Sequence, residues 1–342
     1  MQSRPRKIAA LVLPAVLAVG GAYTVYWYSA ASEVRAAIDR WVAERTAAGW
    51  EVSLSEPRLG GFPSRIEVAI ADGKIAGPEG PSRWRWELPP VTASARPWAP
   101  GNIAIDARGR HRIATGDGPL VARFAAASSD IVAGPGSIRD AMIRLGGVEI
   151  DLPDGTRVAA GLLNMHLREH ARIDEDAAGS PETGTGVAFD ARALSIPAEW
   201  RPALGTSIAR VSLDAVVAGT ADLHGTFRDL LERWRDAGGT LEVRALAVDW
   251  QKLSLRAEGT FALDENLQPQ GAMTADIEGV DPTADALIAA GLIDSQTAFA
   301  AKVANKALTL GGGPARLPLT IQRQRLYLGP VPLLDVPAVE WE

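Results

Sequence analysis

The chain has 342 residues and a formal net charge of −6, with 47% hydrophobic and 22% charged residues. This composition is typical of a folded protein, and the length suits one large domain or two ordinary ones. The acidic balance provides no basic surface for nucleic acid, and the absence of cysteine excludes disulfides, thiol catalysis and thiolate metal sites.

The first feature along the chain is an uncharged segment, residues 8–28, which follows Arg4, Arg6 and Lys7. A helix needs about 20 apolar residues to cross a bilayer, and a basic flank stays on the cytoplasmic side. We therefore predict that residues 1–31 form a cytoplasmic tip and a transmembrane helix. The protein would then be a single-pass protein of a bacterial inner membrane, with most of the chain in the periplasm. The alternative is a cleaved signal peptide, but its apolar core would be unusually long and aromatic.

Residues 32–49 are predicted to form a helical stalk after the membrane segment. Ser32 can cap a helix, Gly49 can end it, and the apolar residues between them recur at helical spacing. From Trp50 onward the period of the apolar residues changes to two, and turn signals rich in Asp and Gly separate the runs. This pattern predicts antiparallel strands.

Two later segments have the pattern of helices. Residues 227–234 are amphipathic and precede a Gly-Gly pair, and residues 284–290 follow an Asp-Pro pair. The acidic, glycine-rich residues 174–186 are predicted to form a mobile loop, with a linker as the alternative. The predicted fold class is therefore α+β and β-rich: an N-terminal transmembrane helix and helical stalk, then antiparallel curved sheets or meanders with two or three packed helices.

The strand region is divided into a first β-rich half, residues 50–225, and a second β-rich half with helices, residues 226–342. Residues 103–109 resemble residues 253–259, since both are alternating strands that end at a glycine. Either a β-meander has been duplicated, or two short alternating strands look alike by chance.

One catalytic pattern stands out, because His166-Leu167-Arg168-Glu169-His170 matches the His-x-x-Glu-His motif of zinc peptidases. That site needs both histidines on a helix, whereas the alternation here predicts a strand, which would place the two imidazoles about 13 Å apart. The sequence contains no phosphate loop, nucleophile elbow or complete dinucleotide fingerprint. We therefore predict a non-enzymatic protein without metal or cofactor.

Two motifs resemble those of a known family. Residues 59–66, LGGFPSRI, are similar to the G-[FY]-P-x-R signature of an uncharacterised proteobacterial family, domain of unknown function 2125, and residues 327–333, YLGPVPL, are similar to its closing segment. The family has no established activity, so the resemblance implies no catalytic residues. A more distant analogy is with AsmA-like envelope proteins, in which an N-terminal anchor precedes curved sheets whose apolar faces are thought to hold lipid.

Both motifs are interpreted as structural. The first motif allows a tight or positive-φ turn at its glycines and a fixed strand start at its proline, and its arginine can pair with a carboxylate or a lipid phosphate. The second motif predicts an extended segment at a sheet edge. The motif residues are Gly60, Gly61, Phe62, Pro63 and Arg65, and Gly329, Pro330 and Pro332.

Alternating apolar residues in several strands could form a ligand-binding face. Two sheets could bury such faces against each other in a closed sandwich, or one open sheet could leave an apolar groove for an acyl chain. The residues concerned are Ile66, Val68, Ile70, Ile103, Ile105, Leu253, Leu255, Phe261 and Leu263.

The predicted function is to bind lipid or another apolar ligand along this sheet face in envelope maintenance, with the inner membrane as a partner through the N-terminal helix. The alternatives are an accessory or assembly subunit that docks onto a membrane protein complex through exposed tryptophans, and a hydrolase whose site sequence cannot reveal. No nucleic-acid partner is expected.

Overall fold

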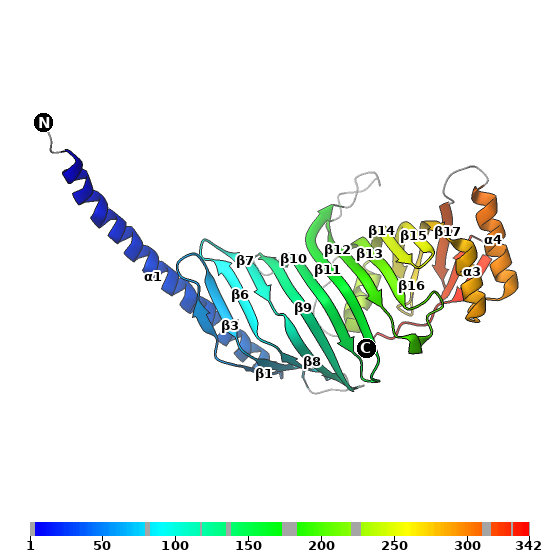
Figure 1. Ribbon diagram of the computed structural model, residues 1–342, viewed down its shortest axis with the longest axis horizontal. Helices are drawn as coiled ribbons and strands as arrows, with labels where there is room; N and C mark the ends of the chain where they lie inside the picture. Colours follow the sequence, from blue (N-terminus) through cyan, green and yellow to red (C-terminus); the bar gives the residue numbers. More distant parts are fainter. Residues whose placement is uncertain are drawn as a thin grey trace.

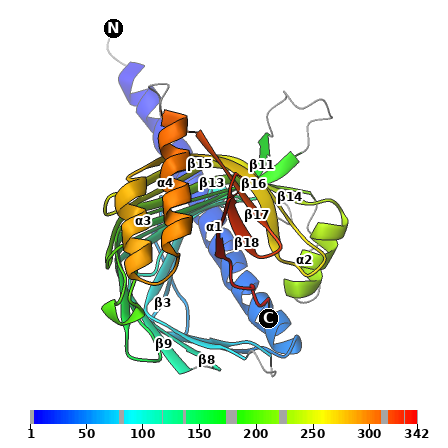
Figure 2. The ribbon, with the colours of Figure 1, turned by 90° about the vertical axis from the view of Figure 1, so that its right-hand side faces the viewer.

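The computed structural model describes residues 4–78, 83–116, 118–134, 138–172, 183–219, 227–309, 316–329 and 331–341. In these residues the chain forms one large antiparallel sheet that bends into a trough (Figure 2). Helix α1 (Arg4–Ala47) lies along one end, and α3 (Val280–Ala289) and α4 (Ser295–Thr309) lie at the other (Figure 1). The β-rich α+β class is confirmed, and the strands form one open sheet rather than two sheets packed in a closed sandwich.

The N-terminal part of the sheet is forked. Strand β9 (Gly118–Ala133) pairs through Gly118–Phe124 with one branch and through Ser128–Val132 with the other. The first branch contains β8 (Gly109–Thr115), β5 (Arg85–Leu88), β4 (Gly73–Ala76) and β1 (Glu51–Leu54). The second branch contains β7 (Ala99–Asp106), β6 (Val91–Arg96), β3 (Ile66–Ile70) and β2 (Arg58–Gly60).

Beyond the fork the sheet is a simple antiparallel meander in chain order, and it continues without a break past residue 226. Its strands are β10 (Ile138–Asp151), β11 (Arg157–Arg172), β12 (Thr183–Ser195), β13 (Ser207–Ala218), β14 (Thr240–Trp250), β15 (Leu253–Leu263), β16 (Pro269–Glu278), β17 (Arg316–Gln322), β18 (Arg325–Leu328) and β19 (Val331–Asp335). A short 3-10 helix, Ala198–Trp200, links β12 to β13, and α2 (Phe227–Asp236) links β13 to β14.

The register keeps apolar side chains on one face of this sheet. Residues paired directly across antiparallel strands point to the same face. One such row, from β7 to β15, consists of Ile105, Ser129, Ile143, Met165, Phe189, Leu213, Leu246 and Ala257. We call this side the trough face, because α1 and α2 lie across it in Figure 2.

The opposite side, the outer face, is polar. Asp130 of β9 and Arg144 of β10 form an ion pair at 2.6 Å, and Asp190 of β12 and Arg210 of β13 form another at 2.8 Å. Each of these residues is next in sequence to a residue of the trough face. The alternation therefore separates an apolar side from a charged side over the length of the meander.

Helix α1 is seated on the fork by aromatic residues. The Trp27 side chain is 4% exposed, and it packs with Ala31 of the same helix against Ile66 of β3. Its indole N–H donates to the Arg65 carbonyl at 3.0 Å, and its ring meets that of Phe62 edge-on at 5.5 Å. The residues around the first motif therefore hold the middle of α1.

The predicted membrane anchor at residues 1–31 is wrong. Across the residues described, no helix is both long and apolar enough to span a bilayer, which contradicts the predicted single-pass protein with a cytoplasmic N-terminus, a transmembrane segment and a periplasmic bulk. The hydroxyls of Tyr23 and Tyr26 donate to the carbonyls of Pro63 and Pro97, so the aromatic end of the apolar run belongs to the folded domain. Residues 8–22 then remain, which is about 22 Å of helix against a bilayer core of about 30 Å.

The other predicted elements are mostly confirmed. The predicted stalk, residues 32–49, is not a separate helix, because its residues up to Ala47 are the last part of α1. Helix α2 contains the first helix predicted in the second half, and α3 contains the second except for Ala290. The predicted loop at residues 174–186 lies largely outside the described residues. Its last four residues, Thr183 to Gly186, belong to β12 instead.

Candidate functional site

The nine residues predicted to form an apolar ligand face all lie on the trough face. On the fork, the register sets Ile66, Ala95 and Ile103 in one row, and Val68, Ala93 and Ile105 in the next. The remaining residue on β3 is Ile70, and those on β15, which alternate in phase with Ala257, are Leu253, Leu255, Phe261 and Leu263.

The middle of the trough face is open to solvent. Ile143, Met165 and Leu167 are 36%, 45% and 39% exposed, and they lie on the adjacent strands β10 and β11. We call these three residues the exposed strip. A contiguous apolar surface that a single chain leaves open is typical of a binding site.

At the forked end, α1 and the sheet line an apolar cavity of about 510 Å³ that is partly open to solvent, which we call the N-terminal chamber. One wall is the α1 stripe of Val34, Ala37, Ile38 and Trp41, the residues that recur at helical spacing in the sequence. The other walls come from both branches of the fork: Leu54, Ile70, Gly73, Ile75, Leu88, Val91 and Ile103.

A second cavity, the middle chamber, has a volume of about 340 Å³ and lies where the two branches meet β9 and β10. Ile105, Ile143 and Phe124 contribute to its lining, together with the buried His111. The Trp86 indole donates to His111 Nδ1 at 3.3 Å, so His111 Nε2 carries the hydrogen and donates to the Ala107 carbonyl at 2.8 Å. Burial lowers the pKa of His111, although the Ala107 carbonyl opposes this shift.

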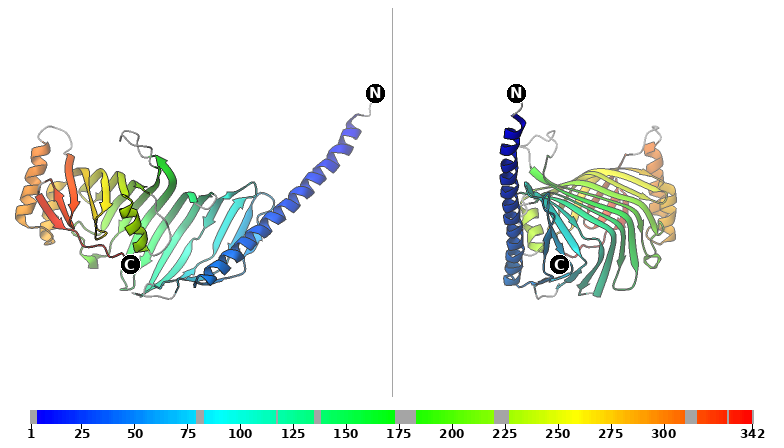
Figure 3. Two further views of the ribbon diagram at one scale, coloured as in Figure 1. Left: turned by 180° about the vertical axis from the view of Figure 1, so that it is seen from behind. Right: turned by 60° about the vertical axis from the view of Figure 1, so that its left-hand side comes forward.

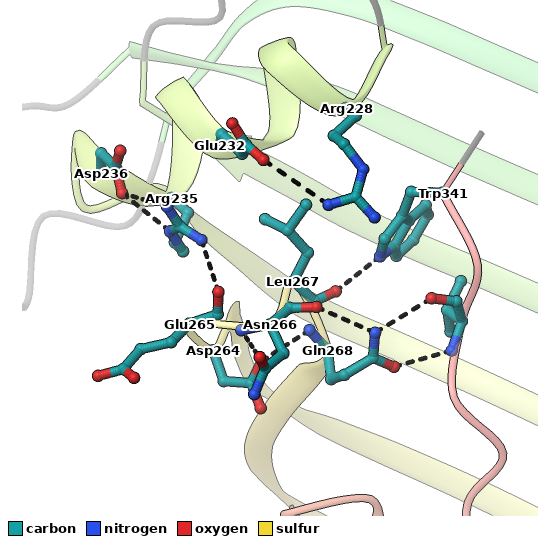
Figure 4. Close-up of polar contacts among 11 residues, drawn as sticks. Arg228, Glu232, Arg235, Asp236, Asp264, Glu265, Asn266, Leu267, Gln268 and Trp341 are labelled. Carbon is teal, nitrogen blue, oxygen red and sulfur yellow. Dashed lines mark hydrogen bonds and ion pairs between the residues drawn. The ribbon is translucent and has the colours of Figure 1, made fainter.

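The third cavity, the C-terminal chamber, has a volume of about 460 Å³ and lies between α2 and strands β13 to β16. Trp234 of α2 is 8% exposed and donates its indole N–H to the Ala218 carbonyl at 2.8 Å. Trp341 comes from the end of the chain and donates its indole N–H to the Leu267 carbonyl at 2.7 Å (Figure 4). Phe261 and Leu263, two of the nine predicted residues, lie in its lining.

The C-terminal segment is clamped in place by one buried side chain. Gln268 is 6% exposed, and its amide donates to the Val339 carbonyl at 3.0 Å and accepts from the Val339 N–H at 2.8 Å (Figure 4). This pair of hydrogen bonds imitates the pairing between two strands. It brings the last residues of the chain over the C-terminal chamber.

The nine predicted residues therefore lie in different surroundings, some in the chambers and some covered by helices. Ile70 and Ile103 line the N-terminal chamber, whereas Ile66 packs under Trp27 and is closed off by α1. Leu255 packs against a core cluster that includes Ala301 of α4. The sequence identified their common face but could not separate open positions from covered ones.

The first motif has a structural role. Gly61 adopts a φ of +94°, the Phe62–Pro63 peptide bond is cis, and the Pro63 and Arg65 carbonyls accept hydrogen bonds from α1. Arg65 pairs with Glu67 at 3.2 Å, and Gly60 ends β2. The motif thus forms the turn on which α1 is seated.

The second motif forms the end of the sheet. Gly329 has a φ of +55° and donates its N–H to the Pro318 carbonyl at 2.8 Å. Pro332 lies in β19, which pairs with β18, while Pro330 falls outside the described residues. The predicted extended conformation is therefore confirmed for Val331 and Pro332 in β19, whereas Gly329 forms the turn before this strand.

The His-x-x-Glu-His segment lies on β11, so the predicted strand is confirmed. The Nε2 atom of His166 is 2.9 Å from an Asp140 carboxylate oxygen of the neighbouring strand. The side chain of His170 lies outside the described residues. Where side chains are described, no three potential metal ligands gather at one place.

The helical spacing in the sequence identified the α1 stripe, but not the chamber that this stripe lines. Sequence reasoning missed that α2 and Trp341 line the C-terminal chamber. The amphipathic pattern of residues 227–234 signalled that α2 packs on something, but not on which face of the sheet. Nothing in the sequence shows that Trp341 returns to a turn about 70 residues earlier.

A family model described as "Uncharacterized protein conserved in bacteria (DUF2125)" matches residues 27–337. The match covers most of the chain, so the protein belongs to this family, as the two motifs predicted. Neither a curated protein nor a solved structure matches the chain significantly. Since the family description states no activity, the function has to be inferred from the geometry.

Proposed function

We propose that this member of the family binds a lipid or another elongated apolar ligand along the trough face, and that it does so without catalysing a reaction. The observation that carries the proposal is the continuity of the apolar face. Leu167 of the exposed strip lies in one row with Ile103 of the N-terminal chamber and Val243 of the C-terminal chamber. Ile143 of the strip itself lines the middle chamber. A long hydrocarbon chain fits such a path better than a compact ligand.

Removal of hydrocarbon from water favours binding on the trough face. Each methylene removed from water contributes about 0.8 kcal/mol, so a single acyl chain covering the exposed strip gains several kcal/mol. The same ligand would cover Ile143, Met165 and Leu167, which water now contacts. The outer face offers charged pairs instead, so binding is expected on one side of the sheet only.

A second candidate function is docking to a protein complex. Trp98 and Trp200 are 62% and 51% exposed, and exposed tryptophans are enriched at protein interfaces. Trp98 lies between β6 and β7, whereas Trp200 lies between β12 and β13. The two are far apart in the sheet, so they form no single patch, and lipid binding remains the function that the geometry favours.

The test uses two aspartate substitutions at equally exposed aliphatic residues on opposite faces. Leu167, 39% exposed, is on the trough face, and Val132, 38% exposed, is on the outer face of β9. Purified full-length protein is irradiated with a photoactivatable phospholipid, and the crosslinked lipid is measured by mass spectrometry. Both variants should keep the melting temperature of the wild type, because neither residue is buried.

Leu167→Asp should lose most of the crosslinked lipid, because a carboxylate on the trough face cannot be covered by hydrocarbon without losing its hydration. Val132→Asp should be crosslinked like the wild type. Binding on the trough face would be refuted if the wild type captured no lipid, or if the two variants captured equal amounts. The docking function would then take first place.

A further inference from the structure

The C-terminal chamber is built from three separate parts of the chain. Helix α2 supplies Leu230, Leu231 and Trp234, the sheet supplies the floor, and Trp341 comes from the last residues. Every described residue in the lining is apolar. The chamber therefore offers an apolar ligand a wholly apolar lining, and it is partly open to solvent.

The polar atoms of this lining are already engaged. The indole N–H of Trp234 donates to the Ala218 carbonyl, and that of Trp341 donates to the Leu267 carbonyl. A ligand in the chamber therefore meets no side chain that offers a free hydrogen bond. A polar head group placed there would lose its hydration without compensation, whereas a hydrocarbon chain would lose nothing.

The arginines of α2 shown in Figure 4 are also engaged by the protein. Arg228 pairs with Glu232 at 3.7 Å, and Arg235 pairs with Asp236 at 2.7 Å and donates to the Glu265 carbonyl at 3.0 Å. Helix α2 also balances its three arginines with three carboxylates, so it presents no net positive charge to attract an anionic head group. The chemistry thus favours the uncharged end of an amphiphile.

We propose that the C-terminal chamber is the binding pocket for the methyl end of an acyl chain, held between α2 and Trp341, while the rest of the chain crosses the exposed strip and the polar head of the ligand lies beyond it. This proposal rests on the proposed function and adds a site, an orientation and a chemical class. It also gives the C-terminal segment a role, because Trp341 forms the wall that closes over the chain end.

The orientation is tested with stearic acid that carries a nitroxide either next to its methyl end or next to its carboxylate. A nitroxide quenches tryptophan fluorescence at short range, and its own electron spin resonance spectrum reports binding independently. Each labelled acid is added to the full-length wild type, to Trp341→Phe and to Trp98→Phe. The last variant removes an exposed tryptophan of the forked end and serves as the matched control.

The label at the methyl end should quench the wild type more strongly than the label at the carboxylate. Trp341→Phe should remove a large part of that difference, and Trp98→Phe should leave it unchanged. Binding of both acids with equal quenching, or a difference that Trp341→Phe does not alter, overturns the orientation and leaves lipid binding intact. Spectra in which neither label is immobilised overturn the proposed function itself.

Discussion

Replacement of Gln268 by alanine should release the C-terminal segment and leave the sheet folded. The Gln268 amide makes two hydrogen bonds to the backbone of Val339, at 3.0 and 2.8 Å. Each such bond contributes about 1 kcal/mol net, so the variant loses about 2 kcal/mol of the free energy that holds the segment closed. The ratio of closed to open segment then falls about 30-fold. The loss is not larger, because the Val339 backbone becomes hydrated once the segment opens.

The measurement is hydrogen exchange at the Trp341 indole N–H, with Gln270→Ala as the control. This N–H donates to the Leu267 carbonyl, which the substitution of Gln268 leaves in place, so its exchange reports opening of the segment. Gln270 is exposed and lies two residues further along the chain, so its removal should leave the exchange rate unchanged. In Gln268→Ala, exchange at the Trp341 indole should accelerate about 30-fold while amides of β15 and β16 keep their protection. An unchanged rate at Trp341, or a similar increase in both variants, would contradict the clamp. Faster exchange throughout the sheet would show that Gln268 stabilises the turn between β15 and β16 instead.

Three further predictions concern stability. Trp27→Ala should weaken the docking of α1 by about 3–5 kcal/mol, measured by hydrogen exchange along the helix, whereas Trp98→Ala should change it by less than about 0.5 kcal/mol. Burial lowers the pKa of His111, so the unfolded state binds a proton at a higher pH than the folded state does. The free energy of unfolding should therefore fall as the pH drops below about 6.5. In thermal denaturation between about pH 8 and about pH 5, His111→Gln should reduce this dependence on pH. Gly239→Ala should lower the free energy of unfolding in urea by about 1–3 kcal/mol, because the added Cβ would lie 2.3 Å from the Trp234 indole.

The local pattern of the strands was predictable from the sequence, but their partners were not. The period of two at Ile66, Val68 and Ile70 correctly placed these residues on one face. Their common face with Leu255 depends on the pairing of the strands that link β3 to β15, which are β6, β7 and the meander from β9 to β14. That register comes from contacts between distant parts of the chain, so no local pattern contains it.

The membrane prediction failed for a physical reason that the sequence hides. An apolar helix end rich in aromatic residues has the same composition whether it meets a membrane interface or a protein turn. Here Tyr23 and Trp27 donate to the carbonyls of Pro63 and Arg65, about 40 residues later in the chain. Only the fold shows that these donors have protein partners.

The loop prediction failed in part because glycine was interpreted as a sign of flexibility. Gly184 lies in β12 and pairs with Ala218 of β13. A Cβ at this position would lie 2.6 Å from a methyl carbon of Val216 and 2.7 Å from the Val217 carbonyl oxygen. Glycine is needed there because two strands approach closely, which is a requirement of pairing rather than of a loop.

The apolar face also depends on a change of phase within the long strands. Leu145 of β10 lies on the trough face, and strict alternation would place Glu149, four residues later, on the same side. Instead Val148 is buried, and Glu149 lies 3.7 Å from Arg157 among charged groups. Between Leu145 and Val148, Gly147 adopts a φ of +56°.

A residue with positive φ inverts the alternation of the strand that contains it, and glycine does so at little cost. Ala193 of β12 repeats the inversion two strands away with a φ of +51°, so the phase changes along a line across the sheet. A Cβ at position 147 would also lie 2.8 Å from the Cβ of Ala125. Glycine is therefore favoured there both by its φ and by the close contact. With regular β geometry at that line, Glu149 would enter the trough. The binding surface proposed here therefore depends on backbone geometry at Gly147 and Ala193 as much as on the hydrophobic pattern.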